Sequence, residues 1–297
     1  MKFSKVLALC CPLLLSTVAG SASAAANPFG ISFQTETNVS LYGKPTGLLV
    51  TGRCNRYDAA FAAARAKGAE VLAYLNAASR PDGRVCSIDQ GFYMNNYGAV
   101  PLWPYPSYGQ RYIWPGTKMT DMRPGSKWIL WVVSYVEKLM RENKVDGVFL
   151  DVIGGRPWNQ SNWTNWSTAE KNAWTDGSVD LVRRLDAKRR AINPNFIIVN
   201  NNIWAITGGS TRGLPGEKYV DGVSIEHPAG VNAYHLAYAK KPFGNLGHRR
   251  VLVIARNATE AKAWSATGVV THVSPQTSAQ YGNPTAPVVS FRALTDR

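Results

Sequence analysis

Nearly the same seven residues occur twice in this chain, and each copy ends in a carboxylate. Val145–Asp151 and Val220–Glu226 both begin with Val-Asp-Gly-Val, continue with Phe-Leu in the first copy and Ser-Ile in the second, and finish with Asp or Glu. Asp-Gly favours a sharp turn. The apolar run after it is too short for a helix and rich in branched residues, which is typical of a strand buried on both faces. We therefore predict two matched parallel strands, each with an acid at its carboxyl end.

Further short apolar segments bounded by turn residues recur along the chain, and segments with helical spacing of apolar residues separate most of them. Eight strands alternating with helices predict an α/β protein with a single-domain (β/α)₈ (TIM) barrel. An open doubly wound sheet is the alternative, because no helix is evident between the first two strands. Besides the two matched segments, strands are predicted at Phe29–Phe33, Gly47–Thr51, Glu70–Leu75, Phe196–Asn200, Arg250–Ala255 and Gly268–Val273, and helices at Tyr57–Lys67, Ser126–Asn143, Thr168–Ile192 and Thr259–Ser265.

The first 24 residues are typical of a secretory signal peptide. A short basic start is followed by an apolar stretch, Val6–Val18, and by the small-residue pattern Ala22-Ser23-Ala24. Cleavage is expected after Ala24, with Ala26 as the other option. The remaining domain, residues 25–297, has no run near the roughly 20 apolar residues that span a bilayer. We therefore expect a secreted or periplasmic protein without a membrane span.

Cysteine usage and charge limit the possible partners. Cys54 and Cys86 are the cysteines that remain after signal removal, and in an oxidising compartment they are expected to form a disulfide. Because they have no histidine partners at ligand spacing, no metal or cofactor is expected. The formal net charge of +14 fits either a solvated basic surface or attraction to an acidic polysaccharide or cell envelope. The basic residues are dispersed and no recognition motif is found, so nucleic acid is not an expected partner.

Asp151 and Glu226 close the two matched strands. Active sites of parallel α/β sheets and barrels lie at the carboxyl edge of the strands. A single acid there could simply cap a helix or form a salt bridge, but two acids on matched strands can perform acid/base or nucleophilic chemistry on an acetal. Asp146 and Asp221 precede the strands and are predicted to be turn or capping residues.

Other strand ends and the loops supply groups suited to sugars. Strand ends carry Tyr74, Asn76, the run Asn200–Asn202 and Arg256. Amides and phenols hydrogen-bond sugar hydroxyls, although the same residues can merely cap a barrel. Loop tryptophans offer flat surfaces for sugar rings, with the alternative that they anchor the loops. The predicted substrate-binding residues are Tyr74, Asn76, Trp103, Trp114, Trp158, Asn200, Asn202 and Arg256.

Several sequence segments resemble a known enzyme family. Asp121-Met122-Arg123-Pro124, the helix with Trp131 and Tyr135, and the segment Val145–Asp151 resemble the core of secreted TIM-barrel glycosidases similar to glycoside hydrolase family 114, the endo-α-1,4-polygalactosaminidases, and to related glycosyl hydrolase families. The resemblance covers residues 70–226 and implies that Asp151 is a catalytic carboxylate with Glu226 as its partner. One departure is Val152-Ile153-Gly154-Gly155, where the family usually places a polar residue directly after the aspartate.

The sequence thus predicts an exported endo-acting glycoside hydrolase for an amino-sugar or acidic polysaccharide, monomeric by default. The order of the acids resembles retaining α-galactosidase-type barrels, which makes Asp151 the expected nucleophile and Glu226 the expected acid/base. A catalytically silent carbohydrate-binding barrel is the main alternative. A metal-dependent phosphodiesterase barrel would suit the positive charge but lacks histidines at ligand spacing.

Overall fold

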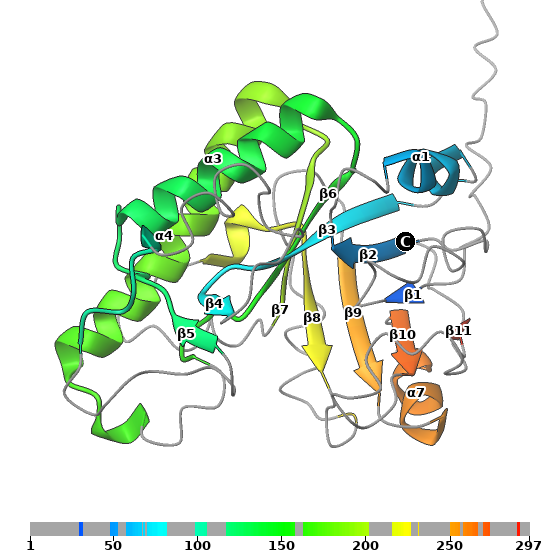
Figure 1. Ribbon diagram of the computed structural model, residues 1–297. Coiled ribbons are helices and arrows are strands. Elements are labelled where there is room, and N and C mark those ends of the chain that lie inside the picture. The colour runs from blue at the N-terminus through cyan, green and yellow to red at the C-terminus, as the bar shows by residue number, and fades with distance from the viewer. Residues whose placement is uncertain are drawn as a thin grey trace, which may run out of the picture.

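Eight parallel strands lie in one sheet in the order in which they occur along the chain (Figure 1). The computed structural model describes residues 30–31, 48–52, 58–66, 68, 70–81, 99–105, 117–157, 163–201, 216–226, 231, 250–255, 258–266, 270–273 and 290–291. All eight predicted strands are present, as β1 (Gly30–Ile31), β2 (Leu48–Gly52), β3 (Glu70–Asn76), β6 (Gly147–Asp151), β7 (Ile197–Asn201), β8 (Gly222–Glu226), β9 (Arg250–Ala255) and β10 (Val270–Val273).

The strand order is that of a barrel rather than of a doubly wound sheet. A doubly wound sheet contains a point at which the strand order reverses, and this sheet runs β1-β2-β3-β6-β7-β8-β9-β10 without reversal. The prediction of a parallel α/β sheet is therefore confirmed.

The predicted closure of the barrel is not seen among the described residues. Within the described residues no pairing joins β1 to β10, and the short strand β11 (Ser290–Phe291) pairs antiparallel with β10. The sheet is thus nine-stranded and open in the part of the chain that the structure describes. Whether residues 25–297 form one domain remains a prediction.

The four predicted helices are also present: α1 (Asp58–Ala66), α3 (Lys127–Glu142), α4 (Thr168–Ile192) and α7 (Ala258–Ser265). Short 3₁₀ turns, η4 (Trp163–Asn165) and η5 (Gly216–Tyr219), precede α4 and β8. A small hairpin of β4 (Ser79–Pro81) and β5 (Thr117–Met119) was not predicted. Among the described residues, no helix combines the length and apolar character that crossing a bilayer requires.

The ends of α3 and the start of α4 follow capping rules. The Ser126 hydroxyl accepts the Ile129 N–H at the start of α3, and Asn143 ends it in the left-handed conformation with φ of 51°. Ser167 caps α4 in the same way by accepting the Glu170 N–H. Serine side chains satisfy N–H groups that have no partner within the helix. Local capping residues therefore set these helix ends.

Helices α3 and α4 lie side by side and cover one face of the central strands (Figure 1). The helices bury Trp128 and Trp174 completely, and the strand residues Phe149 and Ile198 are also fully buried. Burial of large apolar side chains of this kind stabilises a fold by about 1.5–3 kcal/mol each. The strands β6 and β7 therefore lie at the centre of the core.

The repeated Asp-Gly turns perform the same structural task in both copies. Asp146 donates its N–H to the Val71 carbonyl at 2.8 Å and accepts the Val71 N–H on Oδ2 at 2.8 Å. Asp221 donates its N–H to the Ile198 carbonyl at 2.7 Å and accepts the Ile198 N–H on Oδ2 at 2.8 Å. Each aspartate thereby pairs with the start of the strand beside its own. The interpretation of Asp146 and Asp221 as capping residues is confirmed.

An arginine accompanies each of these aspartates. Arg65 lies 2.9 Å from Asp146 at the edge of the sheet. Arg189 is buried and bonds to both Asp221 and Asp186. Burial raises the pKa of Asp221, while the Arg189 charge and the Ile198 N–H oppose that rise.

Gly147 follows the first of these turns, and its neighbours leave no room for a side chain. A Cβ atom at this position would lie 2.2 Å from the Ile197 carbonyl oxygen and 2.7 Å from Leu72 Cδ2. The close approach of β6 to β7 therefore requires glycine.

We predict that Gly147→Ala destabilises the protein by about 1–3 kcal/mol, because the backbone must shift. Urea unfolding measures the change, with the exposed helix substitution Ser134→Ala as a control expected to stay within ~0.5 kcal/mol. An unchanged unfolding midpoint in Gly147→Ala would contradict the close contact.

Asp180 on α4 ties this helix to the turn before α3. Its carboxylate accepts hydrogen bonds from Arg184 at 2.7 Å, from Arg183, and from the Gly125 N–H at 2.9 Å. Desolvation by burial would raise the pKa of Asp180, but these donors outweigh it and lower that pKa below its ordinary 3.8. The stabilisation is therefore present above pH 3.8 and is lost as the pH falls through the lowered pKa.

We predict that Asp180→Asn lowers the free energy of unfolding by about 1–3 kcal/mol at neutral pH, because charged hydrogen bonds are lost. The difference from wild type should shrink as the pH drops below 3.8. Denaturant unfolding at pH 7 and pH 3 measures it. A difference that stays constant between the two pH values would show that the charge of Asp180 is not responsible.

Candidate active site

Asp151 ends β6 at the carboxyl edge of the sheet, between β3 and β7. Its Cα is paired with that of Asn76 on β3, and the preceding Leu150 is paired with Asn200 on β7. Whereas the other residues of β6 are buried, Asp151 is partly exposed. Its carboxylate therefore lies where the core ends and a substrate could reach it.

Three donors hold this carboxylate. The Tyr74 hydroxyl donates to Asp151 Oδ2 at 2.6 Å. Asn201 Nδ2 donates to Oδ1 at 2.9 Å, and the Val152 N–H donates to the same oxygen at 2.8 Å. The two oxygens of a carboxylate offer enough lone pairs to accept all three contacts. Asp151 is thus fixed by groups from both neighbouring strands and from its own backbone.

The backbone directly after Asp151 is strained. Val152 has a φ of 65°, in the left-handed region that branched residues rarely occupy. Such a conformation costs about 1–3 kcal/mol and is often found at functional sites. At the start of this turn, the Val152 N–H donates to the Asp151 carboxylate. Ser178 of α4 holds the following turn by donating to the Gly154 carbonyl at 3.1 Å and accepting the Gly154 N–H at 3.3 Å.

Two adjacent asparagines of β7, Asn200 and Asn201, point to opposite faces of the sheet. Asn201 contacts Asp151, whereas Asn200 is completely buried and donates to the Leu150 carbonyl at 3.3 Å. Successive side chains of a strand point to opposite faces. The structure therefore gives Asn200 a place in the core instead of the predicted substrate-binding role. Asn201 was not among the predicted site residues. The alternation along β7 could have identified it, because Asn201 faces the same side of the sheet as Asp151 and Asn200 faces the other.

Two more of the predicted substrate-binding residues have structural contacts. Asn76 is 9% exposed, and its Oδ1 accepts the Ser79 N–H at 3.2 Å. Trp103 is 8% exposed, and its Nε1 donates to Glu170 at 3.1 Å. The Trp103 ring also packs against Trp166, with 5.7 Å between ring centroids. Asn76 thus caps the chain just after β3 and Trp103 anchors its loop, the alternatives that the sequence left open for each, and their substrate-binding role stays a prediction.

Glu226 ends β8, and the strand register relates its position to that of Asp151. Asn201 is paired with Ser224, and Glu226 follows Ser224 by two residues, so position 226 belongs to the same face of the sheet. One strand, β7, separates β6 from β8. Neighbouring strands are about 4.8 Å apart, which gives roughly 10 Å between β6 and β8.

Several predicted residues lie outside the described part of the structure. These are the side chain of Glu226, the site residues Asn202, Trp114, Trp158 and Arg256, the cysteines Cys54 and Cys86, and residues 1–24.

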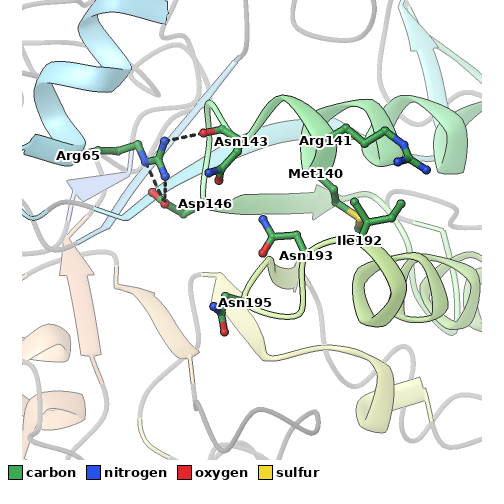
Figure 2. Close-up of a pocket in the computed structure, with 8 residues that line it drawn as sticks. All are labelled: Arg65, Met140, Arg141, Asn143, Asp146, Ile192, Asn193 and Asn195. Atoms are coloured by element: carbon green, nitrogen blue, oxygen red, sulfur yellow. Dashed lines mark hydrogen bonds and ion pairs between the residues drawn. The ribbon is translucent and has the colours of Figure 1, made fainter.

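A pocket of about 650 Å³ lies at the opposite, amino end of the strands (Figure 2). Arg65 lies at one side of it, bonding to Asp146 and donating to the Asn143 carbonyl at 2.7 Å (Figure 2). The charged residues that line this pocket are ion-paired, Arg65 with Asp146 and Arg141 with Glu137. Within the described residues, no cluster of three or more His, Cys, Asp or Glu side chains is placed to hold a metal ion. We therefore place the candidate active site at Asp151.

Comparison with known proteins relates the fold to glycosidases. No protein-family model matches the chain, and no curated protein matches it. The glycoside hydrolase domain of PelA from Pseudomonas aeruginosa is similar in structure, with a TM-score of 0.53 and 14% identity over 89% of this chain and 98% of that one. A variant of that domain with a glutamate replaced by alanine gives 0.55 and 13% over the same shares.

Aspergillus fumigatus Ega3, solved with galactosamine, also matches, at 13% identity over 79% of this chain and 94% of that one, but its TM-score of 0.35 is too low to support an argument. The PelA similarity covers nearly the whole of that domain and concerns the fold alone. The expected resemblance to TIM-barrel glycosidases is thus confirmed at the level of the fold.

Proposed function

We propose that this protein is a glycoside hydrolase that cleaves internal bonds of a polysaccharide. The main support is the Asp151 carboxylate, which three donors hold at the carboxyl edge of the sheet. A second acid position, Glu226, belongs to the same face of that sheet. Two carboxylates that face one sugar ring are the usual equipment for glycoside hydrolysis.

In the proposed retaining reaction, Asp151 is the nucleophile and Glu226 is the acid/base. A carboxylate oxygen of Asp151 attacks the anomeric carbon as the bond to the leaving oxygen breaks, and that oxygen takes the proton of Glu226. Glu226 then removes a proton from water, which attacks the anomeric carbon and releases Asp151. Retention needs carboxyl groups about 5–5.5 Å apart and inversion about 6.5–9.5 Å. Because β7 separates the two strands, the side chains must converge for retention.

The charge of the chain bears on the choice of substrate. With a formal net charge of +14, the protein attracts polyanions and repels polycations at neutral pH. This favours an acidic polysaccharide over a fully deacetylated amino-sugar polymer, and we propose both as substrates to compare. Secretion to the periplasm or the medium would bring the protein to either polymer.

A catalytically silent carbohydrate-binding protein is the second candidate. The observation that favours it is the apolar, buried run after Asp151, with Val152 and Ile153 where the resembling family usually places a polar residue. Such a protein would keep the polar edge of the sheet for binding and would lack turnover.

We predict that Asp151→Asn and Glu226→Gln each lower turnover by roughly 10³-fold or more while the fold is kept, because each removes a reacting group. Release of reducing ends is measured on polygalacturonate, alginate, α-1,4-linked galactosamine polymer and chitosan. Asp146→Asn is the matched control, since this aspartate belongs to the same repeated segment but lies at the opposite end of β6.

The control should lose stability and keep its turnover. Full activity in either Asp151→Asn or Glu226→Gln would remove the assignment. Glycan binding without release of reducing ends from any of these polymers would support the silent protein instead.

A further inference from the structure

We infer that Tyr74 and Asn201 are positioning residues that make the two oxygens of Asp151 different and leave Oδ2 as the reacting atom. The inference rests on the proposed function, because it concerns the same carboxylate. It assigns Tyr74 a different role from the substrate contact that the sequence suggested. It also adds Asn201, which the sequence analysis did not select.

The hydrogen bonds divide unequally between the two oxygens. Oδ1 accepts the Val152 N–H at 2.8 Å and Asn201 Nδ2 at 2.9 Å. Among the residues that the structure describes, Oδ2 accepts a hydrogen bond only from the Tyr74 hydroxyl, at 2.6 Å. Each carboxylate oxygen offers about two lone-pair sites. Oδ1 is therefore saturated, whereas Oδ2 keeps one lone pair that can attack a carbon atom.

Both donors are themselves held firmly, so the carboxylate cannot rotate to exchange its oxygens. The Tyr74 ring on β3 stacks on Phe149 of β6, with 6.1 Å between centroids and 19° between planes. Asn201 on β7 is 1% exposed. Since the donors come from strands on opposite sides of β6, they fix the plane of the carboxylate from both directions.

The two donors then act at different moments of the reaction. When the Oδ2 lone pair bonds to the anomeric carbon, the leaving oxygen departs with the bonding electrons and takes the proton of Glu226. In the resulting ester, Oδ1 is the carbonyl oxygen and keeps its two N–H donors. Oδ2 is now an ester oxygen and a weaker acceptor, so the bond from Tyr74 weakens. Water later breaks the Oδ2–carbon bond, and the Tyr74 hydroxyl stabilises the negative charge that returns to Oδ2.

This order of events gives the Tyr74→Phe variant a distinctive behaviour. Phenylalanine keeps the ring that stacks on Phe149 and removes only the hydroxyl. Release of Asp151 from the ester becomes slower, by about 10- to 100-fold for the loss of a hydrogen bond to a charged group. We expect kcat and KM to fall together and a glycosyl-enzyme adduct to accumulate, visible as added mass on the intact protein. A role in folding alone would not produce an adduct.

Asn201→Ala provides an independent second test, because it removes a donor from Oδ1 and lets the carboxylate turn. We expect kcat/KM to fall by about 10- to 100-fold without an adduct. Tyr219→Phe, before β8, is the control and should behave as wild type. Oligosaccharides of polygalacturonate and of α-1,4-linked galactosamine are the probes for all variants.

The outcomes separate this inference from the proposed function. If Asp151→Asn is inactive while Tyr74→Phe and Asn201→Ala match wild type, the assignment of Oδ2 fails and the hydrolase function stands. If Tyr74→Phe does not fold, the Asn201→Ala result decides alone. If wild type cleaves none of the four polymers named above, or Asp151→Asn stays fully active, the proposed function and this inference fail together.

Discussion

The pairing of two aspartates with the start of a neighbouring strand sets the geometry on which the rest of the sheet depends. Asp146 holds Val71, and Asp221 holds Ile198, each through one backbone and one side-chain hydrogen bond. Because a strand alternates its side chains with a period of two, fixing the register at one end fixes which residues face inward at the other. The five-residue strand β6 then carries Asp151 to the opposite edge.

The two edges of the sheet hold their acidic side chains with different partners. At the amino edge, Asp146 and Asp221 are paired with arginines and with backbone N–H groups, and Asp221 Oδ1 is buried without a hydrogen-bond partner among the described residues. At the carboxyl edge, Asn201 Oδ1 and the Ser224 hydroxyl are buried and have no hydrogen-bond partner among the described residues. Buried polar atoms without partners are uncommon and are found where a water or a ligand is expected to bind. Our proposal places the chemistry at Asp151 because its carboxylate is partly exposed and is held by neutral donors instead of an arginine.

The turn after β6 joins this site to the helical layer. Val152 adopts a strained backbone, and Ser178 of α4 holds the next residues through two hydrogen bonds to Gly154. The apolar residues Val152 and Ile153, a departure from the resembling family, are buried beneath the site. Val152 contacts the carboxylate through its backbone N–H, so an apolar side chain at this position is compatible with the role proposed for Asp151.

The sequence by itself determined the strands, the helices and the edge at which the acids lie, because hydrophobic period, caps and Asp-Gly turns are local signals. It also separated Asp146 from Asp151 by their places before and at the end of one strand. Only the tertiary structure decided that Asn201 rather than Asn200 contacts Asp151, and that Trp103 is buried in a loop. Those outcomes depend on which strands are neighbours and on their register. Contacts between residues 50 or more positions apart produce no local sequence pattern from which they could be predicted.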